Sequence, residues 1–334
     1  MDNLTAPYGS LAFFLDLEPP NADFRADVVA GLSKAQKSLS PKYLYNEQGS
    51  LIFDKITEID AYYPTRTEAS IMDDNRGAIA KSIGPDVNIL EYGAGSTEKI
   101  KRLLNLLEKP SSYVAVDISR DYLIDAMTEF ASSDDAPPMG AICADFTQDI
   151  TVPRAMIPIE NAALTSSWLG YFPGSTIGNF SPTDAQAFLN RAANTLGSGS
   201  RMLIGVDLYK DERILHAAYD DPEGVTAAFN LNVLRRITRE LDAEAAPSDF
   251  EHLAIVNAVE GRVEMHLRAK RETEIIIDGE TFTFAKGETL HTENSYKYTQ
   301  PRLTSLLSPT PWRAREIWTD PQGWFAVCLI CNTQ

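Results

Sequence analysis

Short apolar runs alternate with segments of helical length between Asn88 and Val206. The runs occupy residues 88–92, 113–117, 139–143 and 202–206. Strands that alternate with helices in this way form a parallel sheet covered by helices on both faces. We therefore expect an α/β fold with a doubly wound, mainly parallel sheet. The strand pattern returns near the C-terminus, in residues 312–318 and in the apolar run that ends at Cys331.

A different pattern interrupts this sheet after residue 208. Residues 211–218 and 225–241 have helical periodicity, and the alternating segments 262–267 and 274–277 follow them. The front section, up to residue 66, is rich in aromatic residues. We predict a sheet domain from 67–208 and 298–334, and a second, smaller α+β lobe from 1–66 and 209–297. A chain of 334 residues is long enough for both.

The net charge of the chain limits the classes of partner that it can bind. It carries 47 Asp and Glu against 30 Lys and Arg, a formal net charge of -17. This charge repels phosphate backbones and anionic lipids, so we expect no nucleic-acid or membrane partner. The apolar segment Leu11–Leu15 lacks the basic flank and cleavage site of a secretion signal. We expect a soluble cytoplasmic protein that needs no obligate protein partner.

Cysteine and histidine spacing gives no indication of a metal site. Cys328 and Cys331 lie in one predicted strand, where residues three apart face opposite sides of the sheet. The third cysteine, Cys143, is distant in sequence, and the four histidines lack a spacing such as HExxH. We predict buried thiols and no bound metal.

A glycine-rich turn follows the first predicted strand of the sheet. The string Glu91-Tyr92-Gly93-Ala94-Gly95 leads directly into a helix. Glycines at Gly93 and Gly95 let the backbone turn tightly and approach a ligand closely. A dinucleotide-binding motif would have a third glycine at position 98. This chain has Glu98 there, and a carboxylate is poorly placed beside a pyrophosphate. The turn suits a ligand with a carboxylate and an ammonium group, such as the methionyl end of S-adenosylmethionine.

Two further strand ends carry side chains that suit an adenosine. Asp117 ends the second strand, where a carboxylate in this architecture holds ribose hydroxyls. Asp145 and Phe146 follow the third strand, so that the carboxylate accepts from the adenine amino group while the ring packs on the base. The alternative is that both carboxylates only cap helices and the glycine turn is purely structural.

The chain resembles the histidine-specific, S-adenosylmethionine-dependent methyltransferases of ergothioneine biosynthesis. The resemblance runs from about residue 27 to about residue 330. It implies a Rossmann-like methyltransferase sheet with a second lobe that closes over an amino-acid pocket. It also implies threefold methylation of the α-amine of L-histidine to its betaine, hercynine. The matching strings are Pro41-Lys42, Tyr62-Tyr63-Pro64-Thr65-Arg66-Thr67-Glu68, Gly174-Ser175-Thr176-Ile177-Gly178-Asn179, Tyr219-Asp220-Asp221 and Gly224-Val225-Thr226-Ala227-Ala228-Phe229-Asn230.

The same resemblance assigns roles to individual residues. Tyr62 would lie near the amine and, with an ordered water, guide the loss of its proton. On the cofactor side, Lys99 joins the residues named above. The residues implied at the substrate carboxylate are Asn179 and Tyr219, with Gly174 close by. The residues implied along the rest of the pocket are Thr226 and Phe53 as lining, Tyr45, Glu293 and Ser295 facing the imidazole, and Met265 as an apolar wall.

Three further functions remain open at this point. Fungal relatives of this family methylate tryptophan-derived amines, so another aromatic amino acid is a possible acceptor, although Glu293 and Ser295 favour imidazole over indole. The second function is that of a nicotinamide-dependent oxidoreductase, which Glu98 disfavours, and the third is that of a noncatalytic regulator that binds S-adenosylmethionine. Singly, each pocket residue also has a plain structural explanation, such as a turn cap for Asn179 or a surface position for Glu293.

Overall fold

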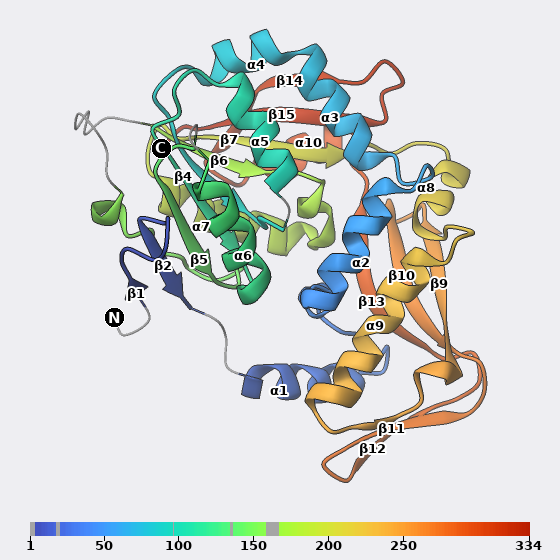
Figure 1. Ribbon diagram of the computed structural model, residues 1–334. Coiled ribbons are helices and arrows are strands. Elements are labelled where there is room, and N and C mark those ends of the chain that lie inside the picture. Colours follow the sequence, from blue (N-terminus) through green and yellow to red (C-terminus); the bar gives the residue numbers. More distant parts are fainter. Residues whose placement is uncertain (1–3, 18–20, 96, 134–135, 158–166) are drawn as a thin grey trace. The chain divides into compact units, whose positions relative to one another are not determined.

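The computed structural model describes residues 4–17, 21–95, 97–133, 136–157 and 167–334 (Figure 1). The chain divides into two compact units. We call the first the sheet unit, which comprises Met1–Glu18, Pro64–Tyr209 and Tyr298–Gln334. The second is the insertion unit, which comprises Pro19–Tyr63 and Lys210–Lys297.

The sheet unit is built on one nine-stranded sheet in the order β1-β2-β5-β4-β3-β6-β7-β15-β14. The six strands from β2 to β7 in that order are parallel, and β1, β15 and β14 pair antiparallel with their neighbours. The strand bounds are β1 (Leu4–Thr5), β2 (Phe13–Asp16), β3 (Asn88–Tyr92), β4 (Ser112–Asp117), β5 (Met139–Cys143), β6 (Trp168–Phe172), β7 (Arg201–Asp207), β14 (Trp312–Thr319) and β15 (Phe325–Asn332).

The order of the strands reverses at β3, which has β4 on one side and β6 on the other. Every residue of β3, β5 and β6 is buried, as expected for parallel strands covered on both faces. In open α/β sheets, ligands bind at the carboxyl ends of the strands beside such a reversal. The fold therefore indicates a ligand site after β3, β4 and β5.

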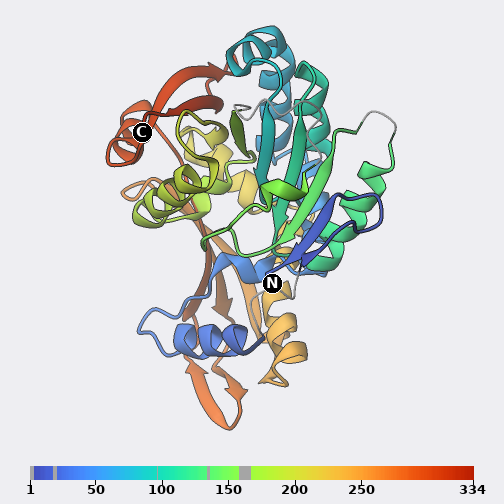
Figure 2. The same ribbon diagram turned by 90° about the vertical axis from the view of Figure 1, so that its left-hand side faces the viewer.

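Helices cover both faces of this sheet. Figure 2 shows α7 on one side of the strands and α3 to α6 on the other. Ile79 of α4, Ile100 of α5 and Leu123 of α6 pack in one apolar cluster with Ile89 of β3. The helices of the unit are α3 (Pro64–Asp74), α4 (Arg76–Ile83), α5 (Thr97–Leu106), α6 (Arg120–Ala131), α7 (Pro182–Leu196) and α10 (Gln300–Leu307), with short 3-10 turns η2 (Arg154–Met156) and η3 (Thr176–Asn179).

The insertion unit has two three-stranded antiparallel sheets, β13-β10-β9 and β12-β11-β8. Helix α9 packs on α2 and on strands β9 and β10. The helices are α1 (Asn21–Leu32), η1 (Pro41–Leu44), α2 (Glu47–Glu58), α8 (Glu212–Tyr219), α9 (Val225–Glu240) and η4 (Pro247–Asp249). The strands are β8 (Glu244–Ala245), β9 (Phe250–Asn257), β10 (Arg262–Ala269), β11 (Thr273–Ile277), β12 (Glu280–Phe284) and β13 (Thr289–Tyr296).

The expected doubly wound sheet with a second α+β lobe is confirmed, with two differences. Strands β1 and β2 belong to the large sheet, whereas the sequence placed residues 1–66 in the second lobe; Phe13 pairs with Gly140 of β5. Strand β6 was not recognised from the sequence, although all five of its residues are buried. A Cβ at Gly170 would stand 2.9 Å from Leu196 and from Met202, so these two side chains would have to shift. No helix in the described part of the chain is long and apolar enough to cross a membrane.

Candidate active site

The carboxyl ends of β3, β4 and β5 meet at one edge of the sheet. Gly93 follows β3 with a φ of 77°, and its N–H donates to the Val116 carbonyl of β4 at 2.8 Å. The Ala144 N–H after β5 donates to the Asp117 carbonyl at 2.9 Å. The positive φ at Gly93 favours glycine, because other residues are strained there. This register brings together Gly93, Asp117 and the residue after Ala144, Asp145.

Both aspartates are oriented by the loops that follow them. One Asp117 oxygen accepts from the Ser119 N–H at 2.8 Å, and burial raises the pKa of Asp117 from its ordinary value. One Asp145 oxygen accepts from the backbone N–H and the hydroxyl of Thr147, at 2.9 and 2.6 Å. Each carboxylate is thus held in a set direction at the strand end, which suits recognition of hydroxyl or amino groups.

Phe146 lies next to Asp145 and is only partly buried. Its ring contacts the rings of Phe172, Phe180 and Phe188, with centroids 5.8 to 6.2 Å away. These neighbours fix the plane of Phe146 at the edge of the sheet. A partly exposed ring in a fixed plane offers one apolar face to a flat ligand.

Glu91 is a buried acid directly beneath the glycine turn. Its side chain is 1% exposed, and the Tyr113 hydroxyl donates to it at 2.5 Å. Burial raises the pKa of Glu91 to about 8, although the hydrogen bond from Tyr113 and the charge of Lys99 act to lower it. Below that pH the group is a neutral acid, because removal from water disfavours the charged form. The sequence marked Glu91 only as part of the glycine string.

Glu68 joins two regions that the sequence assigned to different ligands. Its carboxylate accepts from the Gly174 N–H at 2.9 Å and pairs with the Lys99 ammonium at 3.1 Å. The φ of Gly174 is 73°, and a Cβ there would stand 2.5 Å from the Lys99 Nζ. Sequence reasoning missed Glu68, although it ends one of the matching strings. Glu68 is 5% exposed, so its carboxylate holds the Gly174 loop from the interior of the unit.

The loop that carries Gly174 continues into η3, which ends at Asn179. The Ser175 hydroxyl accepts from the Asp207 N–H at 2.9 Å and so ties the loop to the end of β7. Asn179 therefore sits on a loop held from two sides, by Glu68 and by Asp207. The structure places it in the sheet unit, whereas the other implied carboxylate residue, Tyr219, belongs to the insertion unit.

The insertion unit contains a group of five aromatic rings with centroids 5.3 to 6.3 Å apart. The rings come from the end of η1, from α2 and the turn after it, from α8 and from α9. They are Tyr45, Phe53, Tyr62, Tyr219 and Phe229. The sequence had assigned four of them to the pocket and missed Phe229, which it quoted only inside a matching string. Rings in this arrangement attract a cationic ammonium group.

Glu293 is the acid of this aromatic group. It lies on β13 with 6% exposure, and the Tyr45 hydroxyl donates to it at 3.2 Å. Burial raises the pKa of Glu293 to about 8, against the lowering effects of Tyr45 and Lys297. Met265 of β10 pairs directly with Glu293, and Val263 pairs with Ser295. Glu293, Ser295 and Met265 therefore share one face of the sheet, because side chains alternate along strands.

Tyr219 and Ser295 form a hydrogen-bonded pair at the same face. Their hydroxyl oxygens are 2.7 Å apart, and the Lys297 ammonium donates to both. Thr226, which the sequence also placed in the pocket, begins α9, where its N–H donates to Asp221 at 2.7 Å. The Thr226 hydroxyl is buried and has no hydrogen-bond partner within the described residues. Sequence reasoning missed Lys297, since a lysine that follows a strand is ordinarily solvated.

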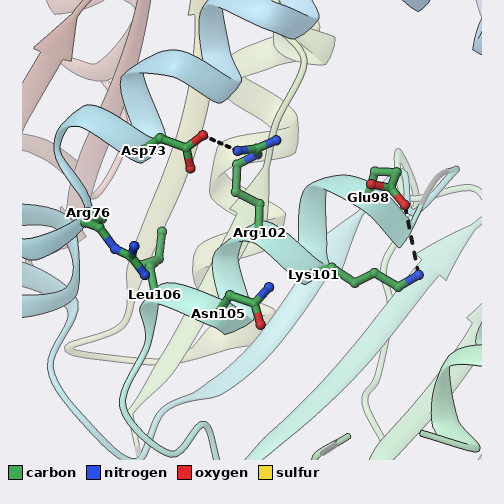
Figure 3. Close-up of a pocket in the computed structure, with 7 residues that line it drawn as sticks. All are labelled: Asp73, Arg76, Glu98, Lys101, Arg102, Asn105 and Leu106. Carbon is green, nitrogen blue, oxygen red and sulfur yellow. Dashed lines mark hydrogen bonds and ion pairs between the residues drawn. The ribbon is translucent and has the colours of Figure 1, made fainter.

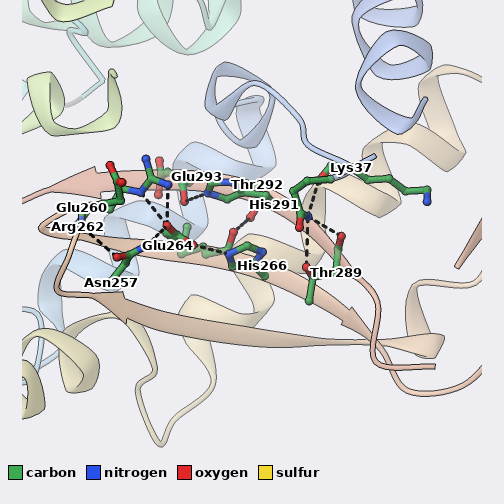
Figure 4. Close-up of polar contacts among 12 residues, drawn as sticks. Lys37, Asn257, Glu260, Arg262, Glu264, His266, Thr289, His291, Thr292 and Glu293 are labelled. Atoms are coloured by element: carbon green, nitrogen blue, oxygen red, sulfur yellow. Dashed lines mark hydrogen bonds and ion pairs between the residues drawn. The ribbon is translucent and has the colours of Figure 1, made fainter. Parts of the chain in front are cut away.

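The opposite face of this sheet carries a polar network that the sequence did not predict (Figure 4). Glu264 accepts from Arg262 and Asn257 at 2.7 and 2.9 Å and contacts His266 at 3.1 Å. The rings of His266 and His291 stack with centroids 4.5 Å apart and an angle of 15°.

Glu264, His266 and His291 offer ligand atoms within 4.8 Å of one another, as a metal site would. However, a metal ion lies in the plane of each imidazole that binds it. Nearly parallel stacked rings share no such point, and Arg262 already neutralises the carboxylate. We therefore interpret the cluster as an ion-pair and hydrogen-bond network.

A shallow surface depression lies over α3, α4 and α5 (Figure 3). Its walls are mostly charged, with Arg102 paired to Asp73, and Lys101 4.0 Å from Glu98. It contains none of the residues that the sequence assigned to a ligand. Arg102 and Lys101 already face acids within this depression, so it is not our candidate site.

The family described as "Histidine-specific methyltransferase, SAM-dependent" matches residues 24–332 of the chain. A protein of Mycolicibacterium smegmatis named histidine N-alpha-methyltransferase is 38% identical over 96% of this chain and 98% of its own length. A protein of the same name from Mycobacterium tuberculosis is 36% identical over 97% of this chain and 99% of its own length. Ergothioneine biosynthesis protein 1 of Neurospora crassa is 32% identical over 63% of this chain and 24% of its own length.

Proposed function

We infer that this chain, which belongs to the family of histidine-specific, S-adenosylmethionine-dependent methyltransferases, transfers methyl groups to the α-amine of L-histidine. Three successive transfers give the trimethylated betaine, hercynine. The observation that carries this proposal is the pairing of Glu293 with Tyr45 beside a group of aromatic rings. Such a site combines recognition of a polar ring with attraction for a cationic amine.

The residues at the edge of the sheet unit fit S-adenosylmethionine. The acids there are Glu91, Asp117 and Asp145. Lys99, whose charge acts on Glu91, is paired with Glu68. The carboxylates of Asp117 and Asp145 accept from hydroxyl and amino groups, and they repel the pyrophosphate of a nicotinamide cofactor. We propose that Asp117 binds the ribose and that Asp145 and Phe146 bind the adenine.

The insertion unit fits the acceptor. We propose that Glu293 and Ser295 bind the imidazole, with Met265 as the apolar wall, because these three side chains share one face of the sheet. An acid and a hydroxyl satisfy ring nitrogens, whereas an indole or phenyl ring leaves most of these groups unpaired in a buried site. Histidine is therefore favoured over tryptophan and phenylalanine.

Methyl transfer is a displacement at carbon. S-adenosylmethionine supplies an electrophilic methyl group whose bond to sulfur breaks as the bond to nitrogen forms. The amine must first lose its proton, because its lone pair is the nucleophile, and each transfer releases one further proton before the next begins. We propose that Tyr62, held between Phe53 and Tyr219, directs the amine and its departing proton. Alignment of the reacting atoms supplies most of the rate enhancement.

The test is mass spectrometry of an amino-acid panel incubated with the protein and S-adenosylmethionine. Mono-, di- and trimethylated histidine are expected to accumulate in succession. Replacement of Glu293 by Ala is expected to lower kcat/KM for histidine roughly ten- to a hundredfold and to narrow its advantage over tryptophan. The matched control is Glu274→Ala, an exposed glutamate of the same unit.

Three different outcomes would contradict the proposal. Preferred methylation of tryptophan would assign another acceptor. Binding of S-adenosylmethionine without turnover of any amino acid would indicate a regulator. Binding of a nicotinamide cofactor in calorimetry would favour the oxidoreductase that Glu98 argues against.

A further inference from the structure

Lys297 is a fully buried lysine in the insertion unit, with 1% exposure. It follows the last residue of β13, and its backbone N–H donates to the Gly261 carbonyl at 2.8 Å. Its ammonium donates to the Tyr219 hydroxyl at 2.9 Å and to the Ser295 hydroxyl at 2.8 Å, and it lies 4.6 Å from the centre of the Tyr219 ring. A buried ammonium is costly unless its N–H donors have acceptors, so the two hydroxyls hold the Lys297 ammonium in place.

These contacts determine how the two hydroxyls use their protons. An ammonium only donates, so the oxygens of both Tyr219 and Ser295 act as acceptors toward Lys297. The two oxygens are 2.7 Å apart, so one of the two hydroxyl protons makes the bond between them. At most one of the two hydroxyl protons therefore makes a bond outside the pair. Lys297 thereby fixes how the two hydroxyls share their protons.

The charge of Lys297 adds to this effect. A hydroxyl that accepts from a cation is polarised, and its own proton becomes a stronger donor. The backbone of Tyr219 is also held, because its carbonyl is bonded to His252 at 2.7 Å. A hydroxyl pair that is hydrogen-bonded to a buried ammonium suits an anionic ligand. The anion of an amino acid is its carboxylate.

We propose that Lys297 is a positioning residue that, through the Tyr219 and Ser295 hydroxyls, prepares the site for the carboxylate of the amino-acid substrate. This inference rests on the proposed function, because it takes the insertion unit to bind an amino acid. It assigns Ser295 a part in carboxylate binding in addition to the ring contact proposed above. The ammonium acts through the hydroxyl pair, so its removal weakens substrate binding more than it changes the chemical step.

The experiment compares histidine with histamine, which keeps the imidazole and the amine but lacks the carboxylate. Binding of each is measured by calorimetry on the wild type and on Lys297→Met, in the presence of S-adenosylhomocysteine. Lys297→Met is expected to bind histidine roughly ten- to a hundredfold more weakly and to bind histamine with little change. The KM for histidine is expected to rise by a similar factor with kcat nearly unchanged, and the affinity for S-adenosylmethionine is expected to stay the same.

The matched control is Lys37→Met. Lys37 is another largely buried lysine of this unit, but it pairs with Glu288 and Phe284 near the start of β13. This variant is expected to bind histidine as the wild type does. Equal losses of histidine and histamine affinity in Lys297→Met, or no loss of either, would overturn the inference. A wild type that binds no amino acid would instead refute the proposed function.

A second pair of variants tests the same proposal if Lys297→Met does not fold. Ser295→Ala and Tyr219→Phe remove one hydroxyl each and keep the lysine. Tyr219→Phe is expected to lose histidine affinity selectively over histamine. If the three residues act as one unit, the losses from Lys297→Met and Tyr219→Phe are less than additive in the double variant. Tyr219→Phe with unchanged histidine affinity, or fully additive losses, would overturn the proposal.

Discussion

Replacement of Glu293 by Gln tests the electrostatics of the site through folding stability. Glu293 is 6% exposed, and burial raises the pKa of its carboxyl group from its ordinary value to about 8. A glutamine has nearly the same shape and accepts from the Tyr45 hydroxyl as the acid does. It does not titrate, so the variant isolates the cost of ionising this one group.

The sign follows from proton binding in the two states. The unfolded chain releases the Glu293 proton near its ordinary pKa, whereas the folded protein keeps it up to a pH of about 8. Between these values the folded state binds more protons, so the free energy of unfolding falls as the pH rises. Each unit of pKa difference is worth about 1.4 kcal/mol, and the wild type should lose about 3 to 4 kcal/mol from this group between about pH 5 and about pH 8.

The assay is urea unfolding of the wild type and Glu293→Gln across this pH range. The variant is expected to gain stability relative to the wild type by the same amount as the pH rises. Glu91 has a similarly raised pKa but is present in both proteins, so its contribution cancels in the difference. Glu274→Gln, at an exposed position, is the control and should follow the wild type. Parallel curves for the wild type and Glu293→Gln would refute the reasoning, because they would mean that the folded state holds Glu293 ionised throughout.

Three further changes test the remaining contacts. Glu68→Ala leaves the Gly174 N–H and Lys99 without this acceptor and should lower the free energy of unfolding by about 1 to 3 kcal/mol, measured by urea denaturation; an unchanged midpoint would contradict it. Asp117→Ala should weaken S-adenosylmethionine binding on the order of tenfold, and unchanged affinity by calorimetry would remove the ribose assignment. Asn179→Ala should raise the KM for histidine and spare cofactor affinity, whereas an equal loss of both would make Asn179 structural.

Much of the fold is already visible in the sequence because it is encoded locally. Strands β3, β4, β5 and β7 are largely apolar, since parallel strands are buried on both faces. The ligand edge follows from the same pattern, because the carboxyl ends of parallel strands meet and Gly93, Asp117 and Asp145 lie at or just after those ends. The family resemblance then supplied the pocket residues that no periodicity marks.

The structure was needed wherever a residue's role depends on a distant partner. Strands β1 and β2 look like an isolated apolar opening in the sequence, but β2 pairs with β5 and β1 pairs with β2. Strand β6 carries Gly170 at its centre, where a Cβ would stand 2.9 Å from Leu196 of α7 and from Met202 of β7. In each case the deciding neighbour is far away in the sequence, so local composition carries no signal of it.

The same limit applies to the charged groups of the site. Glu68 lies 106 residues from the Gly174 amide that it accepts from, and Lys297 lies 78 residues from the Tyr219 hydroxyl that it orients. From the sequence alone, both would be expected to lie exposed to solvent, as most Glu and Lys side chains do. Tertiary packing removed them from water, and burial is what turns a surface charge into a group that must be paired and can therefore position others.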